Sequence, residues 1–137
     1  MNAPITAMHR LMSGLAPVAL SLGALVLNTA EAAPPAKMSN GMLVDASGMT
    51  LYTFDKDVQG SASNCYDEGD SKCATNWPPL FADAAATPEG DFTIIDRKDG
   101  TKIWAYKGWP LYLWIKDTKP GETTGDGVGG VWHTAIE

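Results

Sequence analysis

The chain contains two copies of one short segment, sixty positions apart. Residues 48–57 read GMTLYTFDKD and residues 108–117 read GWPLYLWIKD, so both follow the pattern Gly-x-x-Leu-Tyr-x-aromatic-x-Lys-Asp. An internal repeat indicates that one structural unit occurs twice in the fold. A single hairpin cannot bury its apolar face alone, so the two copies must pack together. The repeat therefore predicts one domain with a pseudo-two-fold axis.

Composition and turn residues predict an all-β fold. All five tryptophans, four tyrosines and three phenylalanines lie beyond residue 50, among scattered glycines and prolines. Aromatic residues at this density favour strands over helices. We expect a small antiparallel sheet, sandwich or barrel built from two hairpin repeats. The expected strands are a hairpin of 42–44 with 50–54, and then 92–96, 103–106, 110–115 and 131–136. One helical turn can begin at Cys73, and Pro78 must end it.

The first residues are typical of an export signal. Arg10 precedes an uncharged, mostly apolar run at 11–27, and Ala30-Glu31-Ala32 follows as a small-x-small cleavage sequence. These features predict a signal peptide cleaved after Ala32. The alternative is a retained membrane anchor, but the run is shorter than the roughly 20 residues that a spanning helix needs.

The expected organisation follows from that cleavage. Residues 1–32 are the signal peptide, 33–40 a flexible lead-in, and 41–137 a single β domain with repeats near 41–60 and 101–120. We expect a periplasmic or secreted protein with no transmembrane segment after cleavage.

The charge balance excludes one class of partner. The net charge is −6, and cleavage removes one positive and one negative residue, so it stays at −6. Nucleic acids and anionic membranes require a Lys/Arg footprint, which the chain lacks. We therefore expect no nucleic-acid partner.

Cys65 and Cys73 are the two cysteines of the chain. An even number of cysteines in an exported protein is most simply a disulfide. Their spacing fits neither the C-x-x-C redox motif nor haem attachment, and no second pair completes a zinc site. We predict a structural disulfide.

The repeated motifs carry a resemblance. Tyr52-x-Phe54-x-x-Asp57 and Tyr112-x-Trp114-x-x-Asp117 both satisfy the pattern Y-x-(F/W/Y)-x-x-D, and the segments at 43–45, 73–80 and 127–133 add further likeness. The chain resembles a bacterial secreted-repeat family of uncharacterised function, which includes predicted lipoproteins. The resemblance implies export and no particular reaction. The chain departs from many members of this family in two ways. It lacks their lipobox cysteine, which argues against a lipid anchor, and its Cys65 and Cys73 lie further apart than their cysteines do.

Asp57 and Asp117 end the two repeated motifs. An aspartate after a strand commonly accepts backbone N–H bonds of the following turn, and its presence in both repeats favours that role. The alternative is a weak calcium site, because one loop concentrates five acidic residues: Asp55, Asp57, Asp67, Glu68 and Asp70. The EF-hand pattern fails there, since its twelfth position is Tyr66 where glutamate is required.

His133 is the only histidine beyond the expected signal peptide. A single imidazole binds a transition metal only with help from other ligands, and Met38, Met42 and Met49 are soft donors suited to copper. The alternatives are a hydrogen-bonded structural histidine and methionines that fill the core. His133, Asp57 and Asp117 are therefore weak metal candidates, and we expect no cofactor.

The five tryptophans are expected mainly to fill the core of the domain. The alternative is that Trp109 is exposed and contacts a partner, because it lies at a turn beside Lys107 and Gly108. Exposed aromatics anchor partners or stack on sugar rings.

Catalysis is not expected, since no serine lies in a G-x-S-x-G context and the cysteines are expected to be oxidised. The sequence predicts an exported, non-catalytic envelope or binding module, whose partner is an unknown protein or envelope component. The alternative is a periplasmic, copper-type metal-handling protein that uses His133.

Overall fold

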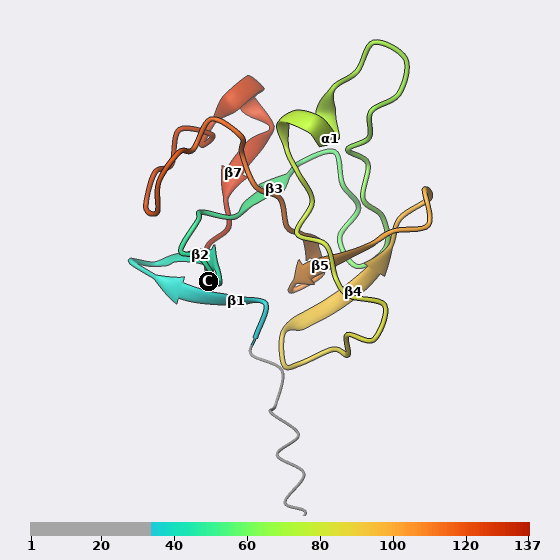
Figure 1. Ribbon diagram of the computed structural model, residues 1–137, viewed down its shortest axis with the longest axis horizontal. Helices are drawn as coiled ribbons and strands as arrows, with labels where there is room; N and C mark the ends of the chain where they lie inside the picture. Colours follow the sequence, from blue (N-terminus) through green and yellow to red (C-terminus); the bar gives the residue numbers. More distant parts are fainter. Residues whose placement is uncertain (1–33) are drawn as a thin grey trace, which may run out of the picture. The chain divides into compact units, whose positions relative to one another are not determined.

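The computed structural model describes residues 34–137 (Figure 1). The expected signal peptide at 1–32 lies outside the described residues. The elements are β1 (Ala36–Ser39), β2 (Met42–Asp45), β3 (Tyr52–Phe54), α1 (Cys73–Asn76), β4 (Phe92–Asp96), β5 (Lys102–Tyr106), β6 (Trp109–Pro110), the 3₁₀ turn η2 (Val128–Gly130) and β7 (Trp132–Thr134). The all-β prediction is confirmed. Within residues 34–137, no helix has the length and apolar character needed to cross a membrane.

The strands form three small antiparallel sheets, which pair β1 with β2, β3 with β7, and β4 with β5 and β6. The hairpin β1–β2 and the hairpin β4–β5 are equivalent. A third segment continues each of them, through the bridge of Val44 with Thr50 in the first repeat and the pair Ala105–Pro110 in the second. Each repeat therefore begins with the same three-segment unit.

Backbone hydrogen bonds show the pseudo-two-fold axis directly. Tyr52 N–H donates to the Tyr112 carbonyl at 2.8 Å, and Tyr112 N–H donates to the Tyr52 carbonyl at 2.9 Å. Each tyrosine thus pairs with its own repeat equivalent, which places the axis between them. The predicted symmetry is confirmed.

A closed ring of three backbone hydrogen bonds occurs once in each half of the domain. Leu43 N–H donates to Ala135, Ala135 N–H donates to Leu51, and Leu51 N–H donates to Leu43. The second ring joins Trp104, Leu80 and Leu111 in the same order. Ala135 follows the second motif and closes the ring of the first, while Leu80 follows the first motif and closes the ring of the second. The two repeats are therefore intertwined.

Two expectations about the strands are corrected. The segment at 33–40, expected as a flexible lead-in, contains β1, and Ala36 on β1 is buried. The turn between β1 and β2 is Asn40-Gly41, and both residues have positive φ. This dipeptide is a strong hairpin signal. The strand expected at 110–115 is shorter: β6 ends at Pro110, and Tyr112 pairs only through isolated bridges.

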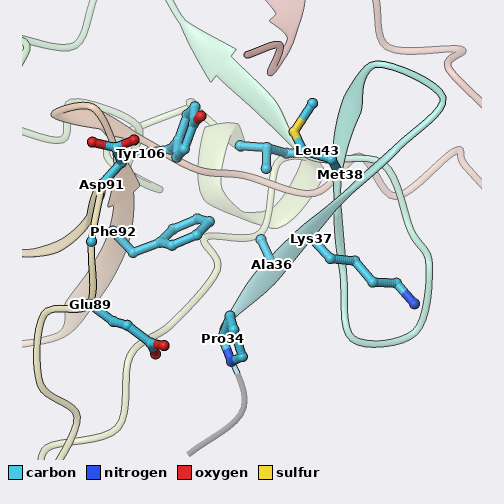
Figure 2. A pocket seen from close by; sticks show the side chains of 10 residues that line it. Pro34, Ala36, Lys37, Met38, Leu43, Glu89, Asp91, Phe92 and Tyr106 are labelled. Carbon is cyan, nitrogen blue, oxygen red and sulfur yellow. The ribbon is translucent and has the colours of Figure 1, made fainter.

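A groove of about 380 Å³ lies between β1 and the start of β4 (Figure 2). Ala36, Leu43, Phe92 and Tyr106 form much of its apolar lining, and Met38 lies at the same surface. The rings of Phe92 and Tyr106 are 5.2 Å apart. β1 therefore has two roles: it pairs with β2 in the first hairpin, and it contributes side chains to the apolar lining of this groove.

Candidate functional site

A stack of four aromatic rings crosses the middle of the domain. Trp77 and Trp132 are parallel, with centroids 3.8 Å apart and an interplanar angle of 4°. Trp114 stacks on the outer face of Trp77 at 3.9 Å, and Phe54 stacks on Trp132 at 4.2 Å. Trp114 and Phe54 are equivalent positions of the repeated motif, so the stack follows the pseudo-symmetry. Trp77 and Trp132 are both 4% exposed.

The two motifs are tied together through their tyrosines and aspartates. Tyr52 Oη donates to Asp117 Oδ2 at 2.6 Å, and Tyr112 Oη donates to Asp57 Oδ2 at 2.8 Å. Each tyrosine thus bonds the aspartate of the other repeat. Burial raises the pKa of both tyrosine hydroxyls, and the neighbouring carboxylates raise it further.

Each aspartate also fastens its own loop. Asn64 N–H donates to Asp57 Oδ1 at 2.7 Å, and Thr124 N–H donates to Asp117 Oδ1 at 3.0 Å. Both side chains are buried. Burial raises the pKa of Asp57 to about 6, although the bonds from Asn64 and Tyr112 and the charge of Arg97 act in the opposite direction.

Arg97 breaks the symmetry of this network. Its side chain is buried and donates to Ser63 Oγ at 2.6 Å, the Cys65 carbonyl at 2.9 Å and Thr101 Oγ1 at 3.1 Å. Ser63 in turn lies 2.7 Å from Tyr112 Oη. Buried arginines are uncommon and require partners for all their donors. Sequence reasoning missed Arg97, because a charged residue just after a strand is normally exposed.

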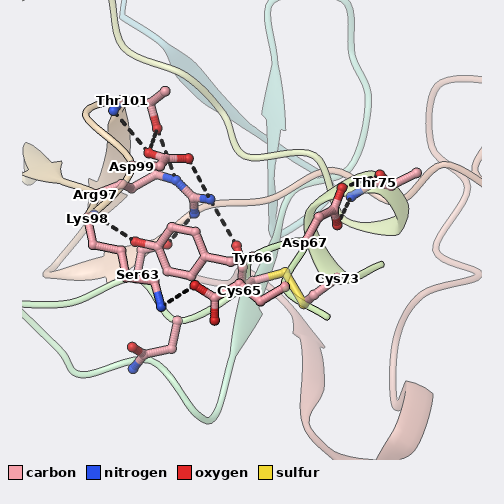
Figure 3. Close-up of polar contacts among 12 residues, drawn as sticks. Ser63, Cys65, Tyr66, Asp67, Cys73, Thr75, Arg97, Lys98, Asp99 and Thr101 are labelled. Atoms are coloured by element: carbon pink, nitrogen blue, oxygen red, sulfur yellow. Dashed lines mark hydrogen bonds and ion pairs between the residues drawn. A yellow bond between two sulfur atoms is a disulfide. The ribbon is translucent and has the colours of Figure 1, made fainter. Parts of the chain in front are cut away.

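The disulfide loop packs over Arg97 (Figure 3). Cys65 and Cys73 are bonded, with Cα atoms 5.2 Å apart, which confirms the predicted disulfide. The Arg97 guanidinium lies against the face of the Tyr66 ring, 4.1 Å from its centroid, and Tyr66 Oη accepts a hydrogen bond from the Lys98 N–H at 3.0 Å. The loop is therefore held to the turn between β4 and β5.

A second groove brings two candidates together. It has a volume of about 510 Å³, and both Trp109 and His133 line it. Trp109 is half-buried, whereas His133 is exposed. His133 Nε2 lies 2.9 Å from Asp55 Oδ2 across the β3–β7 pair. Gln59 Nε2 donates to the Lys107 carbonyl at 2.8 Å along the same wall. We call this site the Trp109 groove.

The weak metal candidates are separated by their contacts. Asp57 and Asp117 are buried, and each accepts a hydrogen bond from a motif tyrosine. His133 lines the Trp109 groove. Met38 lines the other groove, between β1 and β4. In the part of the chain from 34 to 137, no three His, Cys, Asp or Glu side chains meet as a metal-binding cluster.

The chain matches the model of a family described as a secreted repeat of unknown function, once over residues 36–81 and again over residues 93–136. These matches cover more than half of the chain, so the protein belongs to this family, and the expected family is confirmed. The description also supports export. No curated protein and no solved structure is significantly similar to the chain.

Proposed function

We propose that the protein is an exported, non-catalytic binding module and that the Trp109 groove receives its ligand. The observation that carries this proposal is the meeting of a half-buried indole and an exposed imidazole in one groove. Ligand sites typically combine an apolar surface with a few polar groups that orient the ligand.

The pseudo-symmetry supports this choice. In the first repeat, Met49 occupies the position of Trp109, because Gly48-Met49 aligns with Gly108-Trp109. Trp77 and Trp132 are also equivalent, because the residue two positions after each of them pairs with a motif tyrosine: Pro79 with Tyr112, and Thr134 with Tyr52. Pro78 therefore occupies the position of His133. The indole and the imidazole of the groove are therefore absent from the symmetry-related position, which supports one such site per chain.

The chemistry of the groove fits a neutral saccharide of the cell envelope. An indole face stacks on the apolar face of a sugar ring. Gln59, Lys107 and Thr53 line the groove beside it, and these side chains can bond sugar hydroxyls. The net charge of −6 disfavours an anionic polymer.

A non-catalytic role is supported by the surroundings of His133. Among the described residues, the imidazole hydrogen bond runs to Asp55 and none joins it to a hydroxyl nucleophile. A nucleophile–base pair needs that contact. The periplasm or the exterior is the proposed location.

The binding site is tested by NMR. ¹⁵N-labelled protein lacking residues 1–32 is titrated with neutral N-acetylglucosamine oligomers, and the five indole N–H resonances are followed. The Trp109 resonance is expected to shift most. Shifts confined to other tryptophans, or no binding of these oligomers, would contradict the proposed site or ligand class.

A second candidate is metal handling through His133. The observation in its favour is the exposed contact of His133 with Asp55, because a carboxylate beside an imidazole is a common metal-site arrangement. Titration of the protein with Cu(I), Cu(II), Zn²⁺ and Ca²⁺, beside the His133→Ala variant, tests it. Equal binding by the variant, or no tight binding at all, would rule out this function.

A further inference from the structure

The ring stack provides a continuous path between the surface and the two buried tyrosines. Trp77 contacts Trp114 at 3.9 Å and Trp132 at 3.8 Å, and Tyr52 and Tyr112 meet these indoles edge-on at 5.4 and 5.2 Å. Indole and phenol are the aromatic side chains that lose an electron most readily, and rings in contact exchange electrons fast. We propose that the stack is an electron relay, through which a one-electron oxidant at Trp114 draws an electron from Tyr52. This inference is independent of the Trp109 groove.

The sequence difference between the repeats gives the relay one entrance. Trp114 is half-buried and forms one end of the stack, whereas Phe54 forms the other end and is 6% exposed. A phenyl ring is much harder to oxidise than an indole. An oxidant in solution therefore reaches an oxidisable ring of the stack at Trp114 and not at Phe54.

The tyrosines have the proton acceptor that their oxidation requires. A phenol that loses an electron becomes strongly acidic, so a buried tyrosine is oxidised only where a base can take its proton. Asp117 Oδ2 lies 2.6 Å from Tyr52 Oη, and Asp57 Oδ2 lies 2.8 Å from Tyr112 Oη. Both tyrosines are fully buried, so these carboxylates take the place of water.

The charges around the stack favour transfer of the oxidation from Trp114 at the surface to the buried tyrosines. Lys116 Nζ lies 5.6 Å from the centroid of the Trp114 ring and disfavours a positive charge there, whereas the aspartates favour oxidation at the tyrosines. The two tyrosines differ, because the buried Arg97 bonds Ser63, which contacts Tyr112. Tyr52 has no such cation among its contacts in residues 34–137. It is also one ring closer to Trp114, so Tyr52 is the preferred end of the relay.

The overall step balances. Trp114 gives one electron to the oxidant, Trp77 replaces it, and Tyr52 gives one electron to Trp77 and its hydroxyl proton to Asp117. The oxidant is reduced by one electron, and Tyr52 becomes a neutral tyrosyl radical beside a protonated carboxyl. A one-electron reductant at Trp114 reverses the path, and the proton returns to Tyr52. The electron acceptors are therefore high-potential one-electron oxidants, such as organic radicals, and each is reduced by one electron from the protein.

Flash photolysis tests the relay in the protein lacking residues 1–32. Tris(bipyridine)ruthenium(III), generated by a laser pulse with hexaammineruthenium(III) as quencher, is the oxidant, and transient absorption and EPR distinguish tyrosyl from tryptophanyl radicals. The wild type is expected to form a tyrosyl radical whose signal falls several-fold in Tyr52→Phe and in Trp114→Phe. Trp104→Phe is the matched control, since Trp104 is half-buried and outside the stack, and it is expected to leave the yield unchanged.

Two results would overturn the proposal. The first is an equal tyrosyl yield in Trp114→Phe and Trp104→Phe. The second is a signal that survives undiminished in the Tyr52→Phe/Tyr112→Phe variant, because it would come from Tyr66 or Tyr106. If Trp114→Phe misfolds, the Tyr52→Phe variant decides alone, because a tyrosyl yield equal to that of the wild type in this variant also contradicts the relay.

Discussion

At the scale of single residues, Asp57 and Asp117 perform one structural task in two different surroundings. Each carboxylate accepts one hydrogen bond from the tyrosine hydroxyl of the other repeat and one from a backbone N–H of its own loop. Only Asp57 has the buried Arg97 nearby. The role of an aspartate in fastening a turn could be anticipated from its place after a strand. Its bond to the other repeat could not, because that depends on which tyrosine the tertiary fold brings within reach.

The raised pKa of Asp57 predicts a specific pH dependence of stability. Its folded-state pKa of about 6 lies above the ordinary value of 3.8, so the native state binds this proton more tightly than the unfolded state. The contribution is fully present below pH 3.8 and is lost as the pH rises through about 6, by at most about 3 kcal/mol. Urea unfolding at several pH values is compared for wild type and Asp57→Asn. The stability of the wild type relative to the variant should fall across this window, and a flat difference would contradict the prediction.

Gly125 predicts a packing defect. A Cβ at this position would lie 2.8 Å from Trp77 Cη2 and 2.9 Å from Tyr52 Cε1. Overpacking a rigid core costs roughly 1–3 kcal/mol, so Gly125→Ala should lower the free energy of unfolding by that amount. Thr123→Ala, at an exposed residue of the same loop, should change it little. Equal unfolding midpoints for the two variants would contradict this prediction, because they would show that Trp77 and Tyr52 can shift to accommodate the added methyl group.

Among the elements, most strands could be placed from local sequence, but their partners and their exact ends could not. β3 and β7 lie within the expected 50–54 and 131–136, although they pair with each other across the chain. β4 and β5 alternate apolar and polar residues around an Asp-Gly turn, and both form close to the expected bounds. β1 was missed, although Asn40-Gly41 signals its hairpin. β6 is shorter than its apolar run suggests, because Tyr112 and Leu113 donate their backbone N–H groups to Tyr52 and Pro78, away from β5.

The disulfide loop predicts a measurable loss of stability on reduction. Opening the Cys65–Cys73 loop releases unfolded-chain entropy worth roughly 2.5 kcal/mol. The Cys65→Ser/Cys73→Ser variant should therefore unfold at a lower urea concentration than wild type. Reduced wild type should match the variant. A variant as stable as the oxidised protein would contradict a structural role for the bond.

At the scale of the whole molecule, the two repeats form one folding unit. The tyrosine pair, the two backbone rings and the ring stack all join residues of different repeats. The duplication and the pseudo-two-fold axis could be read from the repeated motifs. The intertwining could not, because the segments at 77–80 and 132–135 differ in sequence apart from the shared tryptophan.

This intertwining predicts cooperative unfolding and dependent halves. Far-UV circular dichroism and tryptophan fluorescence should give one coincident urea transition. The separate fragments 34–90 and 91–137 should be unfolded, since each lacks the segment that closes its ring. A dispersed NMR spectrum from either fragment alone would contradict this view of the fold.

We propose that the symmetric parts of the domain are scaffold and that the asymmetric Trp109 groove binds the ligand. The most direct measurement is the affinity for neutral N-acetylglucosamine oligomers of Trp109→Ala beside Met49→Ala, the same substitution at the symmetry-related position. Trp109→Ala is predicted to weaken binding by about tenfold or more, or roughly 1.4 kcal/mol, while Met49→Ala binds as the wild type does. Equal affinities for the two variants would contradict the assignment of function to this groove.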